Sequence, residues 1–89
     1  MEFKGTKGKW IATTSINGRN AVKTIDDDFM FIDTWNARIS PKLTEEQARA
    51  NTVLISKAPE MLEMLKIILS GQFVDKSEIE QLIKEATEL

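Results

Sequence analysis

Apolar and polar side chains alternate with a period of about two through the first forty residues, which predicts β-strands. Residues 10–16 are rich in β-branched and aromatic side chains, and Asn17-Gly18 follows them. Asn-Gly is typical of a two-residue hairpin, because both central positions of its turn need a positive φ. The return strand is expected at 19–25. Asp26-Asp27-Asp28 then predicts a second turn, and a third strand is expected from Phe29 to about Asn36.

From Thr44 onward the apolar spacing changes to about 3.6 residues, which is typical of helices. Thr44 and Gln47 form a capping box at the start of the first helix. Asn51 falls inside the apolar arc of this helix, so its amide is expected to bond backbone of the strand layer or of the loop around Ser40. The expected apolar face consists of Ala48, Leu54, Ile55 and Ala58.

Pro59 interrupts this helical pattern, because a proline beyond the first turn of a helix removes a backbone bond and clashes with the preceding turn. Either a second helix begins near 56–59, or one long helix kinks there. Met61 is expected in the core and Met64 at its rim, and Gly71 suits the position after a helix end. The apolar residues of this segment are Met61, Leu62, Leu65, Ile68 and Leu69.

A last helix is expected over 77–88, with Ser77 and Glu80 as a second capping box. Phe73 and Val74 are expected to hold the preceding loop against the core. The whole pattern predicts a single α+β domain over residues 1–89: a small antiparallel β-meander of about three strands (1–40), a helical region (44–70) and a C-terminal helix, with two or three helices packed on one face.

The composition makes most catalytic mechanisms improbable, because the chain has no cysteine, no histidine and no tyrosine. Disulfides, thiolate metal sites, the usual general base and the commonest zinc ligand are therefore excluded. An acidic cluster at Asp26-Asp27-Asp28 and Asp33 lacks the alternating spacing and the glycine of a calcium loop, and no glycine-rich phosphate loop is present. We expect a protein that is not an enzyme and that has no cofactor and no metal site.

Charge is divided unevenly along the chain, whose net charge is −2. Residues 1–25 carry five basic side chains and one acidic side chain, whereas residues 26–89 carry seven basic and thirteen acidic ones. This basic region is too sparse for a protein that binds DNA on its own. It could still contact a partner, and the candidate partner-binding residues are Lys9, Arg19, Lys23, Trp35 and Arg38. No apolar segment is long enough to span a membrane and no leader is visible, so a cytoplasmic location is expected.

The helical half contains a run that resembles a signature of small phage and prophage proteins: Glu46-Gln47-Ala48-Arg49-Ala50-Asn51-Thr52-Val53-Leu54-Ile55-Ser56-Lys57-Ala58-Pro59-Glu60-Met61-Leu62-Glu63-Met64-Leu65. The common form of that signature reads Glu-Ala-x-Ala-Asn-Ala-x-Leu-Ile-x-x-Ala-Pro-Glu-Leu-Leu-Glu-x-Leu, from which Thr52 and Met61 depart. Those proteins usually open with Gly-Pro-Trp, where this chain has Gly8-Lys9-Trp10. The resemblance covers about residues 5–69, and Trp10, Asn51 and Pro59 are its structural signature residues.

The resemblance implies a protein made inside a bacterial host cell from a phage or prophage gene. Small phage proteins without catalytic residues commonly bind host machinery, so the leading hypothesis is an inhibitor of a host antiviral defence component, for example an anti-CRISPR-type inhibitor that contacts an RNA-guided nuclease or its guide RNA. Two alternatives stay open: a sponge that sequesters a nucleotide second messenger, and a structural or regulatory phage accessory protein. A homodimer also stays open.

Overall fold

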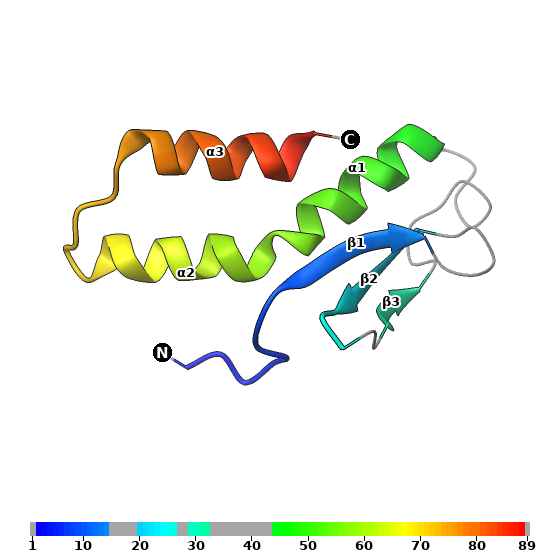
Figure 1. Ribbon diagram of the computed structural model, residues 1–89, viewed down its shortest axis with the longest axis horizontal. Helices are drawn as coiled ribbons and strands as arrows, with labels where there is room; N and C mark the ends of the chain where they lie inside the picture. Colours follow the sequence, from blue (N-terminus) through cyan, green and yellow to red (C-terminus); the bar gives the residue numbers. More distant parts are fainter. Residues whose placement is uncertain (1, 15–19, 27–28, 33–43, 89) are drawn as a thin grey trace.

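The computed structural model describes residues 2–14, 20–26, 29–32 and 44–88. Within them, three strands precede three helices (Figure 1). The predicted α+β fold is confirmed. The elements are β1 (Trp10–Thr14), β2 (Asn20–Thr24), β3 (Phe29–Ile32), α1 (Glu45–Ser56), α2 (Ala58–Leu69) and α3 (Lys76–Thr87).

The strands form one antiparallel meander in the order β1-β2-β3. Trp10 of β1 pairs with Thr24 of β2, and Thr14 pairs with Asn20 at the other end. The register between β2 and β3 shifts between Val22 and Lys23, where a bulge interrupts the ladder. The predicted turn at Asn17-Gly18 lies outside the described residues, but the antiparallel register of β1 and β2 brings the ends of that segment together.

Helix α1 packs on β1 and β2, and its buried residues have small side chains. Ala48, Thr52 and Ser56 follow one another at intervals of four residues and are all buried, and Ala21 and Val22 of β2 are buried as well. The expected apolar face is therefore wrong in part, because Leu54 is 47% exposed. Small residues let the backbone of a helix approach its neighbours closely. The face of α1 that carries alanine, threonine and serine is therefore the buried face.

The capping box that the sequence predicts at the start of α1 is confirmed. The Gln47 amide N–H donates to Oγ1 of Thr44 at 3.0 Å, and Oε1 of Gln47 accepts from the Thr44 amide at 3.0 Å. Glu45 and Glu46 occupy the first turn, where negative charge is favourable beside the helix dipole. This end of α1 is therefore fixed locally, before any contact with the sheet.

Pro59 separates two helices, which resolves the alternative that the sequence left open. α1 ends at Ser56, and Lys57 caps it by donating its amide N–H to carbonyl groups of Leu54 and Ile55. α2 begins at Ala58, so that Pro59 occupies its second position, where a missing N–H costs no helical bond.

Helix α3 begins one residue earlier than expected and with a different cap. The N-cap is Asp75, whose Oδ1 accepts from the Ser77 amide at 3.0 Å, so the predicted capping box of Ser77 and Glu80 is wrong. Asp75 competes for the cap position because its short carboxylate also suits the positive helix end. α3 packs against α1, with Ala86 buried and with Lys57 Nζ 3.8 Å from Oε1 of Glu85.

The molecule is elongated, with principal extents of 44 × 24 × 19 Å. Figure 1 shows α1 crossing over the sheet at one end, while α2 and α3 run beside each other past the sheet edge. The sheet and α1 thus form one packed unit, and the α2–α3 hairpin extends from it.

Candidate interaction surface

Helix α2, the most apolar of the helices in the described residues, has no buried residue. Leu62, Leu65, Ile68 and Leu69 of α2 are 37, 63, 49 and 70% exposed. Leu62, Leu65 and Leu69 are spaced by three and four residues, so they form one stripe within about 60° of the helix circumference. We call Leu62, Leu65, Ile68 and Leu69 the α2 ridge.

Phe73, in the loop after α2, is a further exposed apolar side chain, since it is 90% exposed. The expectation that Phe73 holds the loop against the core is therefore wrong, and Val74 is only half-buried. With on the order of 170 Å² for each fully exposed large side chain, the ridge and Phe73 expose about 500 Å² of apolar surface. The ridge alone contributes roughly 370 Å² of this area, which is within the range of the largest apolar patch on a typical monomer, and such patches are often functional.

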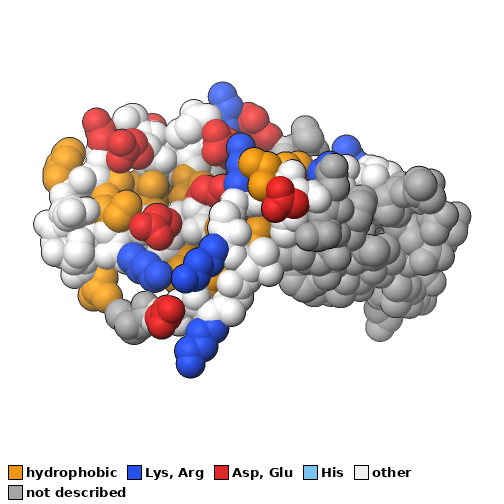
Figure 2. Space-filling view, turned by 60° about the horizontal axis from the view of Figure 1, so that its bottom comes forward, with side chains coloured by type: hydrophobic (Ala, Val, Ile, Leu, Met, Phe, Trp, Pro, Cys, Tyr) orange, Lys and Arg blue, Asp and Glu red, His pale blue; other side chains and the backbone are white. Residues whose placement is uncertain are grey.

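No other helix or strand of the described residues covers the α2 ridge. α3 packs more closely on α1 than on α2, so Met61 and Met64 of α2 are both only half-buried. The expectation that Met61 is a core residue is wrong for this reason. Figure 2 shows apolar side chains gathered over the part of the molecule that α2 and α3 build, with acidic and basic side chains around them.

A groove of about 520 Å³ runs between α2 and α3, on the face of α2 that carries Glu60 and Met64 and away from the leucine stripe. We call it the interhelical groove. Met64 and Leu82 give it an apolar lining, whereas Glu60, Glu78 and Glu85 make it acidic. Its remaining lining residues are Ser77 and Gln81. Glu85 already interacts with Lys57 and accepts from Nε2 of Gln81 at 3.1 Å.

Glu60 differs from the other acidic residues of the groove. Its Oε2 atom is buried, and it has no hydrogen-bond partner among the described residues. Burying a carboxylate oxygen without a donor is unfavourable, although the position of Glu60 in the first turn of α2 places it near the positive end of the helix dipole. Glu60 is therefore able to accept a hydrogen bond from a group that the chain itself does not supply.

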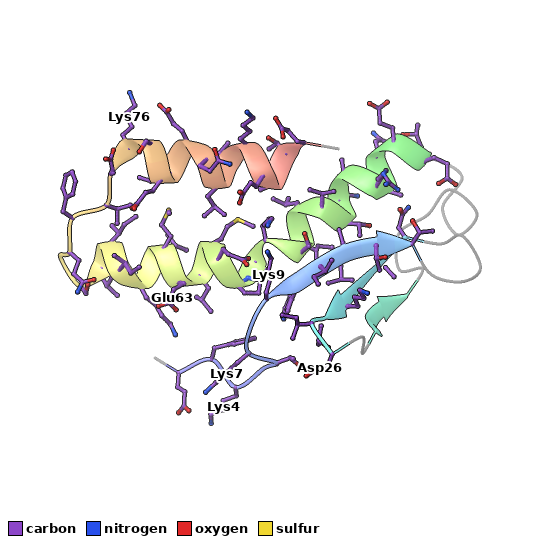
Figure 3. All side chains as sticks on the ribbon, viewed as in Figure 1. Lys4, Lys7, Lys9, Asp26, Glu63 and Lys76 are labelled. Carbon is purple, nitrogen blue, oxygen red and sulfur yellow. The ribbon has the colours of Figure 1, made fainter. Side chains whose placement is uncertain are left out.

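A second groove, of about 450 Å³, lies between α2 and the N-terminal segment. Figure 3 shows Lys4 and Lys7 on that segment and Glu63 on the neighbouring side of α2. Both signs of charge line this groove: Glu2, Lys7, Glu60, Glu63 and Lys66, together with Phe3, Gly8 and Pro59. It is thus less selective for charge than the interhelical groove.

Of the partner-binding residues predicted from the sequence, Lys9 and Lys23 lie among the described residues, and neither lines the interhelical groove. Lys9 is exposed just before β1, and Lys23 is half-buried in β2, where it pairs with Ile11. Arg19, Trp35 and Arg38 lie outside the described residues. The role of these five side chains therefore stays a prediction.

The signature residues have structural positions in the described part of the chain. Trp10 opens β1, is half-buried and donates from Nε1 to the Thr6 carbonyl at 3.1 Å. Asn51 is half-buried on α1, but the loop around Ser40 lies outside the described residues, so its predicted hydrogen bond stays a prediction. Pro59 marks the start of α2.

Neither a metal site nor a membrane span is present in the described residues. No group of three or more acidic, histidine or cysteine side chains converges there as a metal site would require. Among the same residues, no helix combines the length and the apolar character needed to cross a membrane.

Fold and surface define a small α+β protein whose most apolar helix lies at the surface. The chain matches the family of Salmonella phage P22 protein Y8K6 over residues 1–88, and it belongs to that family. It is thus a small phage protein, as the sequence resemblance implies. No curated protein matches the chain, and no solved structure does.

Proposed function

We propose that this protein is a non-enzymatic phage accessory protein that acts by binding a host protein through the α2–α3 hairpin. The observation that supports this proposal most directly is the exposure of α2, which carries apolar side chains along its length and buries none of them. Exposed apolar area of this extent is unfavourable in water, so its burial against a partner lowers the free energy. The family supplies the phage context.

The more specific form of the proposal is inhibition of an antiviral defence component, with an RNA-guided nuclease as the concrete target. An inhibitor of this kind needs only a surface that occupies or distorts the target. The chain offers no histidine or cysteine for catalysis, and its acidic hairpin suits a basic surface such as the walls of a nucleic-acid channel. The phage context and the acidic charge of the hairpin support this defence role.

A nucleotide sponge receives less support from the cavities described above. Both grooves are large enough for a small ligand. However, each contains three glutamates, and the interhelical groove has no basic lining residue. Phosphate groups would be repelled there. We therefore do not propose this function.

The test uses three variants in a bacterial host that carries an active RNA-guided nuclease and is challenged with a targeted phage. Wild-type protein should restore phage growth. The triple variant Leu62→Ser/Leu65→Ser/Leu69→Ser should lose protection while it stays folded, because these side chains contribute little to the core. Ile25→Ser is the matched control, since Ile25 is 71% exposed outside the hairpin.

The variant Arg19→Glu/Lys23→Glu tests the competing surface. If it abolishes protection while the triple leucine variant does not, the basic hairpin of β1 and β2 is the binding surface and the proposal is wrong about the site. Equal phage growth with and without the protein, across hosts that carry different defence systems, would contradict the defence role. The structural or regulatory accessory role would then be the better hypothesis.

A further inference from the structure

We propose that β1 pairs antiparallel with β1 of a second copy of this chain, so that the sheets of two molecules join into one continuous sheet. The inference concerns the outer edge of β1 and makes no use of the α2–α3 hairpin, so it is independent of the proposed function. Three features support it: the edge position of β1, its uncharged sequence and the distribution of charge around it.

Strand β1 lies at one edge of the sheet that the described residues form. The order β1-β2-β3 gives β1 a single neighbouring strand, and α1 packs on both β1 and β2, which places it over a face of the sheet (Figure 1). In an antiparallel ladder, alternate residues point their N–H and C=O groups away from the neighbouring strand. Within 11–14 these groups make no backbone hydrogen bond to a described residue outside the ladder. A second extended chain is the partner that satisfies such a row of groups.

The sequence of β1 has none of the features that usually prevent an edge strand from pairing. Its residues are Trp-Ile-Ala-Thr-Thr, with no charged side chain and no proline. The register between β1 and β2 is continuous over all of β1, whereas the bulge lies in the ladder between β2 and β3. Charged residues, prolines and bulges are the common means by which natural edge strands avoid pairing. The β-branched and aromatic residues of β1 instead favour a strand on both of its sides.

One register uses the whole length of β1. A two-fold axis at Ala12 places Trp10 opposite Thr14 of the second copy and Ile11 opposite its Thr13. Each pair then joins residues on the same face of the joined sheet. An aromatic residue opposite a β-branched one is a favourable cross-strand pair.

The charges around β1 favour this antiparallel arrangement of two copies. Lys4, Lys7 and Lys9 precede β1 (Figure 3). Lys9 is three residues from Ala12, so the Lys9 side chains of the two copies begin about 20 Å apart along the strands, which is about twice the Debye length. The acidic hairpins also lie at opposite ends of the joined strands, because each extends past the start of its own β1 (Figure 1). A second copy therefore fits this edge without contact between like charges.

Sedimentation of the full chain over a range of concentrations tests the pairing. Wild type should form a reversible dimer with a dissociation constant on the order of 100 μM, because one strand edge buries less area than a standard interface. Hydrogen exchange should slow for amides within 11–14 as the concentration rises, with β3 amides affected less. This measurement needs no variant.

Charge variants at Thr13 then locate the interface. In the proposed register, Thr13 of one copy is diagonal to Thr13 of the other, so Thr13→Lys should weaken the dimer by about two- to fivefold. Labelled Thr13→Lys protein should bind unlabelled Thr13→Glu protein at least roughly threefold more tightly than it binds unlabelled Thr13→Lys protein. Ile25→Lys is the matched control, since Ile25 is 71% exposed outside β1, and it should dimerise like wild type. Circular dichroism checks that each variant is folded.

Three results would overturn the inference. They are a wild-type chain that stays monomeric throughout, a dimer without slower exchange within 11–14, and labelled Thr13→Lys protein that binds both Thr13 variants equally. A dimer that Leu65→Ser dissociates and Thr13→Lys does not would identify the α2 ridge as the contact instead. A monomeric wild type that still protects phage in a leucine-dependent way would contradict only this inference. A dimer without phage protection would contradict only the proposed function.

Discussion

Two hydroxyl side chains, those of Thr52 and Ser56, are buried on α1. Oγ1 of Thr52 donates to the Ala48 carbonyl at 2.8 Å, and Oγ of Ser56 donates to the Val53 carbonyl at 2.6 Å. Each hydroxyl is thus satisfied within its own helix and can be buried without a partner from the sheet. At the residue scale, the core therefore depends on size and on local hydrogen bonding, with Val22 as its one large fully buried side chain among the described residues.

Thr44 gives the first prediction at this scale. Thr44→Ala removes the side chain that accepts from the Gln47 amide, so it should lower the free energy of unfolding by about 1 kcal/mol. Urea unfolding followed by circular dichroism measures this change. Thr44→Ser keeps the acceptor and serves as the control. Equal losses for both variants would show that packing of the threonine methyl group, rather than the cap, is responsible.

At the scale of elements, each of the three helices is bounded by signals in its own sequence. Thr44 and Asp75 cap α1 and α3, Pro59 opens α2, and Gly71 follows the end of α2. Gly71 has φ = +85°, and its amide donates to the Ile68 carbonyl at 3.1 Å. A left-handed residue at this position ends the helix and starts the loop to α3, as the sequence predicts.

Gly71 gives the prediction for this scale. Gly71→Ala should destabilise the protein by about 1 kcal/mol, because a Cβ is unfavourable at this positive φ. No atom lies within 4 Å of the added Cβ, so backbone strain is the only cost. Thermal unfolding should show a smaller loss for Gly71→Asn, which tolerates the left-handed region better. A larger loss for asparagine than for alanine would contradict this account.

At the scale of the whole molecule, the position of α3 decides which apolar surface stays open. α3 packs on α1 through Ala86, and the ion pair of Lys57 and Glu85 lies beside this contact. With α3 held there, α2 has no layer over its ridge. The exposure of α2 is therefore a consequence of the docking of a different helix.

Ala86→Glu tests this arrangement. The new carboxylate would lie at a contact where Ala86 is only 5% exposed, so the protein should lose about 2–3 kcal/mol of stability, with α3 detached from α1. Hydrogen exchange should report faster exchange of α3 amides, with β2 amides affected less. Ile83→Glu adds the same charge at a site of α3 that is 57% exposed and should leave exchange nearly unchanged. Similar exchange in both variants would show that Ala86 does not hold α3.

The sequence alone determined the elements of this protein, because strands, turns and caps depend on residues that are close along the chain. The hairpin signals, the capping box of Thr44 and Gln47, and the glycine after α2 are all local. Periodicity could identify the apolar stripe of α2, but it could not show whether a neighbour covers it. The sequence therefore placed Met61 and Phe73 in or against the core, and both placements were wrong.

Only the tertiary structure decided which apolar residues are buried. Ala48, Thr52 and Ser56 are the buried residues of α1, whose small side chains let neighbouring elements approach closely, and α3 packs more closely on α1 than on α2. These choices depend on contacts between segments far apart along the chain. The candidate surface is what remains uncovered once those contacts have formed, so no pattern within a single helix could identify it.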